Sequence, residues 1–223
     1  MSKKLSVVIP VYNAEKYIAE AVGSVLEQGW DGEVEVIVID DGSTDRSCEI
    51  AESLGCKVLH QDRLRAANAR NRGIKEASGD LIFMLDADDV SAAGSLAKLL
   101  EPFISDDSVI ASFGMTVDFY SPDMPEEERV KIKIRTEPYA GILPGASLIA
   151  RSVFDEVGLF DSSMTSGETV DWMVRLRSSG MKTVQIEDTV LRRRIHMTNT
   201  GRTDRREEMK NYAALLRKRM GNK

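Results

Sequence analysis

The sequence predicts an α/β fold in which one mostly parallel sheet is flanked by helices. Through the first ninety residues, apolar runs rich in β-branched residues alternate with helical patterns, as is typical of parallel strands joined by crossover helices. These runs are continuously apolar, which is expected of strands buried on both faces. Three of them end in polar side chains, at 12–13, 40–42 and 86–89. Parallel strands would bring these ends to one edge of the sheet, where such folds bind ligands.

The elements of the first half follow from local patterns. The helix from residue 14 has its apolar residues on one amphipathic face. Ser43 or Thr44 is expected to cap the next helix and Gly55 to end it. In chain order, the predicted elements are strand 5–11, helix 14–28, strand 33–39, helix 43–54, strand 56–60, helix 65–77 and strand 81–85.

The second half is less regular. The acidic, proline-containing stretch 121–129 predicts an exposed loop, and the strict alternation VKIKIR at 130–135 predicts a half-exposed or edge strand. The remaining predictions are helix 94–103, strand 109–120, a loop with Pro144-Gly145, strand 147–151, helix 152–157, helix 170–179, strands 183–186 and 190–194, and helix 205–219.

Composition limits the function classes. The formal net charge is −6 over 223 residues, which argues against nucleic acid as the main partner. Residues 192–223 carry a net +8 and the rest −14, so the tail either contacts an anionic membrane or phosphate-rich ligand, or is a solvated helix. Cys48 and Cys56 lack CxxC spacing, which favours a reducing compartment. No apolar run reaches the roughly 18 residues of a membrane span and no signal peptide is recognisable, so we expect a cytoplasmic protein.

The stretch FMLDADDV at 83–90 places three carboxylates directly after an apolar run. Crowded carboxylates repel one another unless a cation lies among them. Carboxylate oxygens suit Mg²⁺ or Mn²⁺, which usually take one or two protein carboxylates together with phosphate oxygens. DAD therefore predicts a site for a metal-bridged diphosphate. The alternative, that Asp88 or Asp89 only caps the following helix, stays open on this motif alone.

An ordered set of stretches resembles the family 2 glycosyltransferases of the GT-A fold. The resemblance runs from Leu5 to His196; no single motif is decisive, but the ordered set is specific. It implies one domain, 1–223, with a Rossmann-like, mostly parallel sheet and a smaller antiparallel acceptor-side part. Residues 1–90 would form the nucleotide-binding half, 91–200 the acceptor-side half and 201–223 a basic C-terminal helix. The stretches are SVVIPVYNAEKYIAEAVGSVLEQ, EVIVIDDGSTDRSCEIAESLG, ARNRGIKEASGDLIFMLDADD, PGASLIARSVFDEVGLFD and, at 167–180, GE..DW..RL...G.

The resemblance implies a set of residues that bind the nucleotide sugar. Asp41 matches the aspartate that accepts a hydrogen bond from the uracil edge, although DDGSTD could be only a turn and a helix cap. Arg65 matches a basic residue near the nucleotide, and Arg70 and Arg72 either hold diphosphate or face solvent. The set comprises Pro10, Val11, Tyr12, Asn13, Asp40, Asp41, Arg65, Asp86, Ala87 and Arg194.

The same resemblance assigns the metal. Asp88 matches the family's metal-binding aspartate, Asp86 is expected to face the donor ribose or sugar, and Asp89 is a cap or a supporting group. His196 is either a metal ligand, a phosphate contact or a structural residue. Arg192 and Arg194 would share one strand face, with guanidinium groups suited to phosphate.

The acceptor side is expected to include Gly145 and Ala146, in a loop where glycine permits close approach of a ligand, although an ordinary tight turn explains this loop equally. Trp172, in the helix predicted at 170–179, is the third acceptor-side residue. The base departs from the family pattern, because Thr169 stands where an aspartate is usual. Glu168 or Asp171 would then deprotonate the acceptor hydroxyl, unless no functional base exists.

The function implied is an inverting hexosyltransferase that uses Mn²⁺ or Mg²⁺. It would move a sugar, most simply from a UDP-sugar, to a saccharide, a lipid-linked or another hydroxyl acceptor in polysaccharide or glycolipid synthesis. The alternative is a degenerate member that binds without efficient transfer. A receiver-type phosphoacceptor domain fits the chain length poorly, and a sugar-nucleotide pyrophosphorylase would need a glycine-rich turn where PVYNAEKY stands. Peripheral contact with the inner face of a membrane would go through the basic C-terminal helix.

Overall fold

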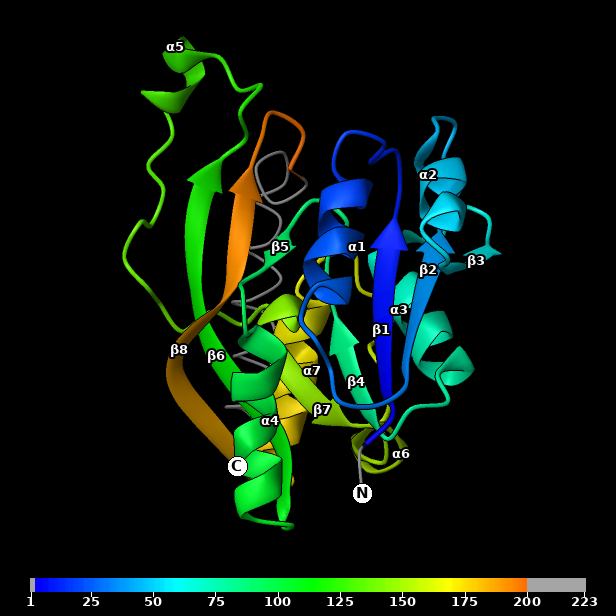
Figure 1. Ribbon diagram of the computed structural model, residues 1–223, viewed down its shortest axis with the longest axis vertical. Helices are drawn as coiled ribbons and strands as arrows, with labels where there is room; N and C mark the ends of the chain where they lie inside the picture. The colour runs from blue at the N-terminus through cyan, green and yellow to red at the C-terminus, as the bar shows by residue number, and fades with distance from the viewer. Residues whose placement is uncertain (1–2, 200–223) are drawn as a thin grey trace.

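Eight strands form one sheet in a computed structural model, which describes residues 3–199 (Figure 1). The order across the sheet is β3-β2-β1-β4-β7-β6-β8-β5. The strands are β1 (Leu5–Val11), β2 (Val34–Asp40), β3 (Lys57–His60), β4 (Leu81–Met84), β5 (Val90–Ser91), β6 (Val109–Tyr120), β7 (Ser147–Ala150) and β8 (Lys182–Ile195).

Pairing is parallel from β3 through β2 and β1 to β4, and again between β6 and β8. It is antiparallel where β7 joins β4 to β6 and where β5 joins β8. The predicted α/β class, with a mostly parallel sheet and a smaller antiparallel part, is therefore confirmed.

Helices cover both faces of the sheet, and each face has its own apolar core. One core contains residues of α1, α2 and α4, and the other contains residues of α3, α6 and α7. The helices are α1 (Ile18–Leu26), α2 (Ser47–Ser53), α3 (Arg65–Glu76), α4 (Ser95–Ser105), α5 (Glu126–Arg129), α6 (Val153–Val157) and α7 (Glu168–Ser178), with a 3₁₀ turn η1 (Pro144–Ala146).

The continuous apolar strands divide their side chains between these cores. Leu5, Val7 and Ile9 of β1 belong to one and Val8 to the other, as the two-residue period of a strand requires. Gly73 lets α3 approach closely, because a Cβ there would lie 2.2 Å from Val8 Cγ1. This close packing fixes α3, and with it the side chains of its first turns, against the sheet.

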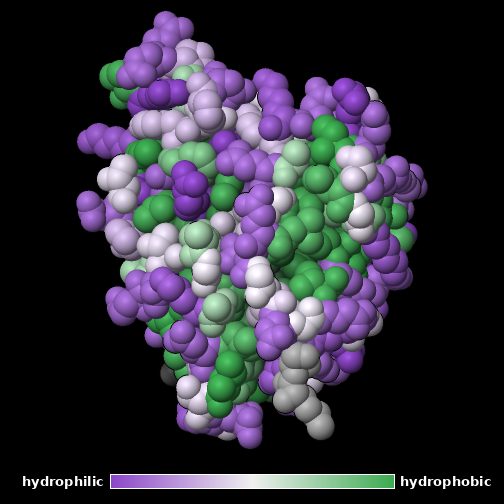
Figure 2. Space-filling model, viewed as in Figure 1, coloured by the Kyte–Doolittle hydropathy of each residue, from purple (hydrophilic) through white to green (hydrophobic). Residues whose placement is uncertain are grey.

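One face of the sheet stays partly uncovered. Figure 2 shows apolar side chains gathered beside α1 over β1 and β2, where α2 is short. Trp30, Val34, Ile50 and Val58 are partly buried apolar residues packed against this core. No helix among residues 3–199 has the length and apolar character needed to cross a membrane.

Several element predictions need correction. Residues 130–135 form no strand. The backbone of β6 meets the return segment through Asp118 N–H to Arg135 O and a bridge between Thr116 and Tyr139, and the side chains of Asp118 and Tyr120 add hydrogen bonds to it. The alternation instead half-buries Ile132 and Ile134 on one side while the lysines are exposed. Residues 121–129 contain the short helix α5 rather than only a loop.

Other corrections concern the lengths of elements. The two strands predicted over 183–194 form one strand, β8, whose pairing with β6 absorbs irregularities in register. The short strand β5 was not predicted. The first helix starts four residues late, because Asn13 has a left-handed backbone (φ 48°) and a turn precedes the helix. The predicted helix 205–219 lies outside the described residues.

Candidate functional site

Three strand ends meet at the carboxyl edge of the sheet, as the sequence predicts. β1 pairs in parallel with both β2 and β4, so segments 12–13, 40–42 and 86–89 leave the sheet side by side. Pro10 and Val11 belong to β1 itself; Pro10 is half-buried, and the side chain of Val11 is buried in the core. The convergence brings polar groups from three chain segments to one place.

The end of β1 presents an aromatic ring and a fixed amide. The guanidinium of Arg63 lies 4.0 Å from the ring centroid of Tyr12. Asn13 Oδ1 accepts a hydrogen bond of 2.8 Å from the backbone N–H of Thr44. This bond ties the turn after β1 to the turn after β2.

Asp41 holds the turn that precedes α3. Its Oδ1 accepts hydrogen bonds from Gln61 Nε2 at 2.8 Å and from the N–H of Leu64 at 2.7 Å, and its Oδ2 accepts from the N–H of Arg65 at 2.8 Å. Arg65 has a φ of 73°, a left-handed conformation that costs energy for a residue with a Cβ. The carboxylate therefore stabilises a strained turn, and the side chain of Arg65 remains exposed at its surface.

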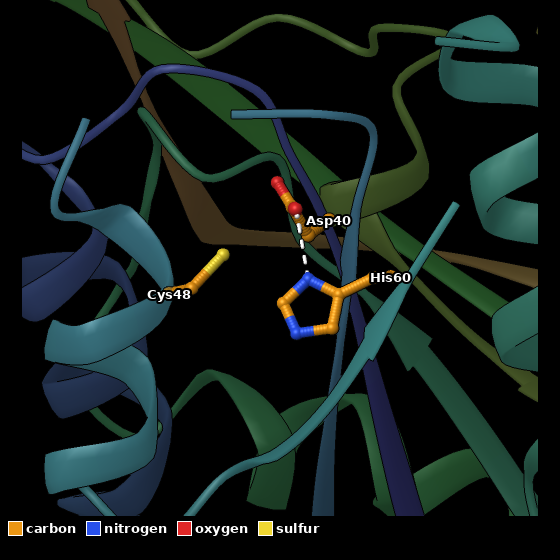
Figure 3. A group of neighbouring side chains, drawn as sticks. All are labelled: Asp40, Cys48 and His60. Atoms are coloured by element: carbon orange, nitrogen blue, oxygen red, sulfur yellow. Dashed lines mark hydrogen bonds and ion pairs between the residues drawn. The ribbon is translucent and has the colours of Figure 1, made fainter. Parts of the chain in front are cut away.

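Asp40 pairs with a histidine on the neighbouring strand (Figure 3). His60 Nδ1 lies 3.0 Å from Asp40 Oδ2, and the N–H of Ser43 donates to Oδ1 at 2.9 Å. Burial raises the pKa of the Asp40 carboxyl, but the hydrogen bonds from Ser43 and His60 outweigh it and lower that pKa overall. The thiol of Cys48 reaches the same place from α2.

A buried arginine links two of the candidate carboxylates. Arg70, only 6% exposed, donates from Nη2 to Asp86 at 2.8 Å and from Nη1 to Glu168 at 2.9 Å. Burial lowers the pKa of Arg70, but the charges of Asp86 and Glu168 outweigh it and raise that pKa overall. The end of β4 and the start of α7 are thus joined through one cation on α3.

Asp88 lies against the segment that follows β8. Its Oδ2 is 2.8 Å from His196 Nε2 and 3.3 Å from Asn199 Nδ2. The His196 ring packs on Tyr17 with ring centroids 4.9 Å apart. The side chain of Asp88 stays partly exposed, whereas Ala87 between the two aspartates is buried in the core.

Asp89 and Arg194 are buried supports beneath this turn. Asp89 Oδ1 accepts from the N–H of Arg194 at 2.8 Å. Burial raises the pKa of the Asp89 carboxyl well above its ordinary value, and the charges of Asp88 and Asp86 raise it further. Arg194, 2% exposed, donates from Nε to Asp88 O at 2.8 Å and pairs with Glu20 at 2.5 Å. Its guanidinium therefore braces the turn, and a contact with diphosphate stays a prediction.

The two candidate bases have different surroundings. Glu168 begins α7 and pairs with the buried Arg70 described above. Asp171 accepts a 2.8 Å bond from Arg175 Nε, and the same guanidinium donates to the carbonyls of Val157 and Leu159. Asp171 therefore helps to fix the loop before α7, while Glu168 lies with Asp86 at the sheet edge.

The acceptor-side residues predicted from sequence are buried. Gly145 and Ala146 form part of η1, and a Cβ on Gly145 would lie 2.9 Å from Leu191 Cδ1. Trp172 is 1% exposed and its indole N–H donates to Gly158 O at 2.7 Å. Trp172 and Thr169 line a small, mostly apolar pocket between η1 and α7, so an acceptor role for these groups stays a prediction.

Sequence reasoning missed several residues that complete the site. Tyr17, Glu20 and Asn199 support the 86–89 turn and its neighbours from positions distant in sequence, and no local pattern marks them. His60 had a usable signal, since it ends the predicted strand beside the one that leads to Asp40. Cys48 could be added to this pair only by knowing that α2 begins at Ser47, which places the thiol beside Asp40 and His60.

Curated relatives match parts or most of the chain. The glycosyltransferase GlyG of Streptococcus pneumoniae serotype 4 is 39% identical over 107 residues, which is 45% of this chain and 35% of GlyG. The uncharacterized glycosyltransferase RT0329 of Rickettsia typhi is 29% identical over 229 residues, or 96% of this chain and 70% of that protein. The matched part of the chain thus spans about a third of the length of GlyG, and nearly the whole chain spans 70% of RT0329.

Solved structures with the same fold include complexes with a nucleotide and with a nucleotide sugar. S. aureus TarS 1–349 in complex with UDP aligns at a TM-score of 0.67 and 21% identity, covering 86% of this chain and 60% of TarS. Mannosyltransferase PcManGT from Pyrobaculum calidifontis, in complex with GDP-Man and Mn²⁺, aligns at 0.70 and 18%, covering 97% and 65%. These likenesses confirm the GT-A fold. A sequence profile described as Glycosyl transferase family 2 matches residues 6–158, most of the chain. The chain therefore belongs to glycosyl transferase family 2.

Proposed function

We propose that this protein is an inverting glycosyltransferase that moves a sugar from a nucleotide-sugar donor, in the first instance a UDP-sugar, to an acceptor hydroxyl. The observation that carries the proposal is a group of three carboxylates: Asp86 and Glu168, which Arg70 links, and Asp88, which is two residues from Asp86 and bonded to His196. It offers one carboxylate to a donor sugar, one to a cation and one to an incoming hydroxyl at the same sheet edge. TarS and PcManGT, described above with UDP and with GDP-Man and Mn²⁺, support a donor of this class.

The nucleoside would lie across the ends of β1 and β2. Each carboxylate oxygen has about two acceptor positions, and with donors from residues 3–199 Asp41 fills two on Oδ1 and one on Oδ2. One position on Oδ2 is therefore left for a base N–H such as that of uracil. Tyr12 and Asn13 would form the adjoining wall, and Arg65 would reach the nucleotide from the strained turn.

The donor set around Asp88 fits a divalent cation. It offers a partly exposed carboxylate, whose oxygens suit Mn²⁺ or Mg²⁺, and an imidazole in contact with that carboxylate. Asp86, Asp88 and Asp89 place three carboxylates within four residues, and a cation would relieve their mutual repulsion. Asp88 would hold the ion and His196 would complete or orient its shell. When bound, the ion supplies positive charge that stabilises the departing diphosphate.

Glu168 is the base in this proposal. Its carboxylate would take the proton of the acceptor hydroxyl as the oxygen attacks the anomeric carbon, and the bond from that carbon to the diphosphate oxygen would break on the opposite face. One displacement of this kind inverts the configuration. Arg70 would keep Glu168 ionised and oriented, because a neighbouring cation favours the carboxylate.

A degenerate, non-transferring member of the family is the second candidate. The observation that favours it is Thr169, which stands at the usual position of the base and lines an apolar pocket. Single replacement of Glu168 and of Asp171 by Ala separates the two candidates. A transferase loses turnover in one variant, whereas in a binding protein neither change alters a turnover that is already absent.

The remaining parts of the proposal concern domain, acceptor and location. The chain would act as one unit, with a nucleotide-binding half at 1–90 and an acceptor-side half at 91–200. The acceptor, a saccharide, a lipid-linked or another hydroxyl compound, would enter between η1 and α7. The protein would work in the cytoplasm, and any peripheral membrane contact would use 201–223, which lies outside the described residues.

Thermal unfolding with candidate nucleotides tests the donor site. The protein is heated with UDP, GDP, CDP or dTDP, each with Mn²⁺ or with EDTA. Ligand at about 100 times its Kd should stabilise the fold by about 2.7 kcal/mol. We expect a Mn²⁺-dependent rise with one nucleotide that Asp88→Ala abolishes and the exposed control Asp107→Ala retains. No rise with any nucleotide would refute the donor site.

A further inference from the structure

A second group of possible metal ligands lies at the same edge of the sheet, away from the 86–89 turn. Asp40 and His60 end β2 and β3 and face each other in the strand register. Cys48 is the second residue of α2. Figure 3 shows the three side chains converging from these three elements.

The three groups are close enough to share one ion. His60 Nδ1 and Asp40 Oδ2 are 3.0 Å apart, and one ligand atom from each of the three residues lies within 4.8 Å of the others. Asp40 is 4% exposed, Cys48 is half-buried, and the His60 side chain is 63% exposed. The group is thus anchored on its inner side and open to solvent through the imidazole.

Asp40 brings a buried negative charge to this group. Among residues 3–199, His60 is the one ion-pair partner that Asp40 has. Burial raises the pKa of the Cys48 thiol to about 11, and the charge of Asp40 contributes to the rise. A dication at this position would attract the Asp40 carboxylate and favour the thiolate of Cys48, whose proton would pass to solvent.

We propose that Asp40, Cys48 and His60 form a second cation site, selective for a thiophilic dication such as Zn²⁺. Thiolate and imidazole ligands suit Zn²⁺, whereas the carboxylate-rich 86–89 turn suits Mn²⁺ or Mg²⁺. Three protein ligands leave a fourth position for water. A bound ion would cross-link β2, β3 and the start of α2, and would fix the strand end from which Asp41 follows.

Cobalt spectroscopy tests this site without relying on activity. Metal-free protein is titrated with Co²⁺, which takes tetrahedral sulfur and nitrogen ligands much as Zn²⁺ does and gives a strong near-ultraviolet band when bound to a thiolate. We expect the band in the native protein and its displacement by Zn²⁺. We expect Cys48→Ser to abolish it and His60→Ala to weaken Co²⁺ binding at least about tenfold, since loss of an outer partner of a ligand already costs 10–100-fold.

The second cysteine supplies a matched control. Cys56 is buried in the core and lies outside the cluster, so Cys56→Ala should keep the band, and Asp88→Ala should keep it too. Circular dichroism of the metal-free variants checks that each is folded. If Cys48→Ser does not fold, Cys48→Ala replaces it in the titration. A native protein without the band, or a band that survives loss of Cys48, would overturn the proposal. Neither result bears on nucleotide binding at the 86–89 turn.

Discussion

The two carboxylate turns at the sheet edge differ in where their partners come from. Asp41, after β2, is held by residues 61–65 of the same half of the chain. Asp88 and Asp89, after β4, are held by residues 194–199, more than a hundred positions later. The first turn can form with its own half, whereas the second is complete only when β8 has paired with β6 and β5.

This difference predicts different responses to substitution. Changes around Asp41 should act locally, on the turn before α3 and on the nucleoside. Changes around Asp86 and Asp88 should affect both halves of the chain. They should alter cation binding, the position of the proposed base and the stability of the fold together. The largest expected effects therefore lie where α3, β4 and α7 meet.

Replacement of the proposed base should have the largest effect. Glu168→Gln keeps the hydrogen bond to Arg70 but removes proton acceptance, so we expect kcat to fall about 10²–10⁴-fold with little change in donor binding. Asp171→Asn is the matched control, because Asp171 is bonded to the structural Arg175, and it should lose less than about tenfold. A larger loss of kcat in Asp171→Asn than in Glu168→Gln would make Asp171 the base and Glu168 a structural residue. The measurement is steady-state transfer from the nucleotide sugar identified by thermal unfolding.

Removal of the cation that joins the halves should have the next largest effect. Arg70→Met leaves Asp86 and Glu168 near each other without their shared partner. Breaking a buried ion pair costs about 3–5 kcal/mol. Because Asp86 is partly exposed, we expect the free energy of unfolding to fall by about 3 kcal/mol. Urea unfolding measures it, with Lys75→Met on the exposed side of α3 as the control. Equal free energies of unfolding for the two variants would show that the ion pairs of Arg70 make no net contribution to stability.

A paired experiment sharpens the contrast between the two turns directly. Asp41→Asn should weaken UDP binding about tenfold, equally with and without Mn²⁺, because one carboxylate oxygen becomes a donor facing the N–H of Arg65. His196→Ala should weaken only the Mn²⁺-dependent binding, by about 10–100-fold. Isothermal titration with Mn²⁺ or EDTA measures both, and exposed Asp62→Asn serves as control. If the two variants respond to Mn²⁺ alike, the distinction between the turns is wrong.

The smallest effect is expected far from both turns, at the start of β2. Glu35 accepts hydrogen bonds from Ser6 Oγ at 2.5 Å and from Ser78 N–H at 2.7 Å. Burial raises its pKa, but these bonds outweigh it and lower that pKa below the ordinary 4.5. The ionised form therefore stabilises the fold above about pH 4.5, and this stability is lost as pH falls through the lowered pKa.

Glu35→Gln should reduce the free energy of unfolding by about 1 kcal/mol at pH 7 and should flatten its decline below about pH 4.5. Urea unfolding between pH 3 and 7 measures both. Exposed Glu33→Gln is the control and should change stability by less than about 0.5 kcal/mol. If the free energy of unfolding of Glu35→Gln declines with falling pH as steeply as that of the native protein, Glu35 is not the source of the acid destabilisation.

The same contrast explains how much could be predicted from the sequence. The strands of the first half, the parallel pairing and the convergence of three strand ends follow from local apolar runs and their order. The strand predicted at 130–135 was wrong because alternation reports only which side chains are buried. It does not report whether the backbone pairs in a regular ladder. β7 pairs with β6 only over 111–113, and beyond it the return segment meets β6 through an isolated bridge at Thr116 and Tyr139 rather than through a strand.

The site divides in the same way. The carboxylates of both turns were visible in the sequence, as was Glu168. Their partners were not assigned, because Arg70 lies 98 residues from Glu168 in the sequence and His196 lies 108 from Asp88. Such pairs depend on tertiary packing, and the burial of Trp172 and Arg194 likewise follows only from the assembled core.

The single strand β8 has a consequence for how this chain can tolerate changes in length. It runs without interruption for 14 residues and ends beside the 86–89 turn. Because a shift of one residue reverses every side chain of a strand, one inserted residue near Arg192 would exchange the faces of Arg193 and Arg194 and displace His196. The excursion at 121–143, which forms no strand, has no such register to keep. Among related sequences, we therefore expect insertions and deletions between β6 and β7 and none in the last residues of β8.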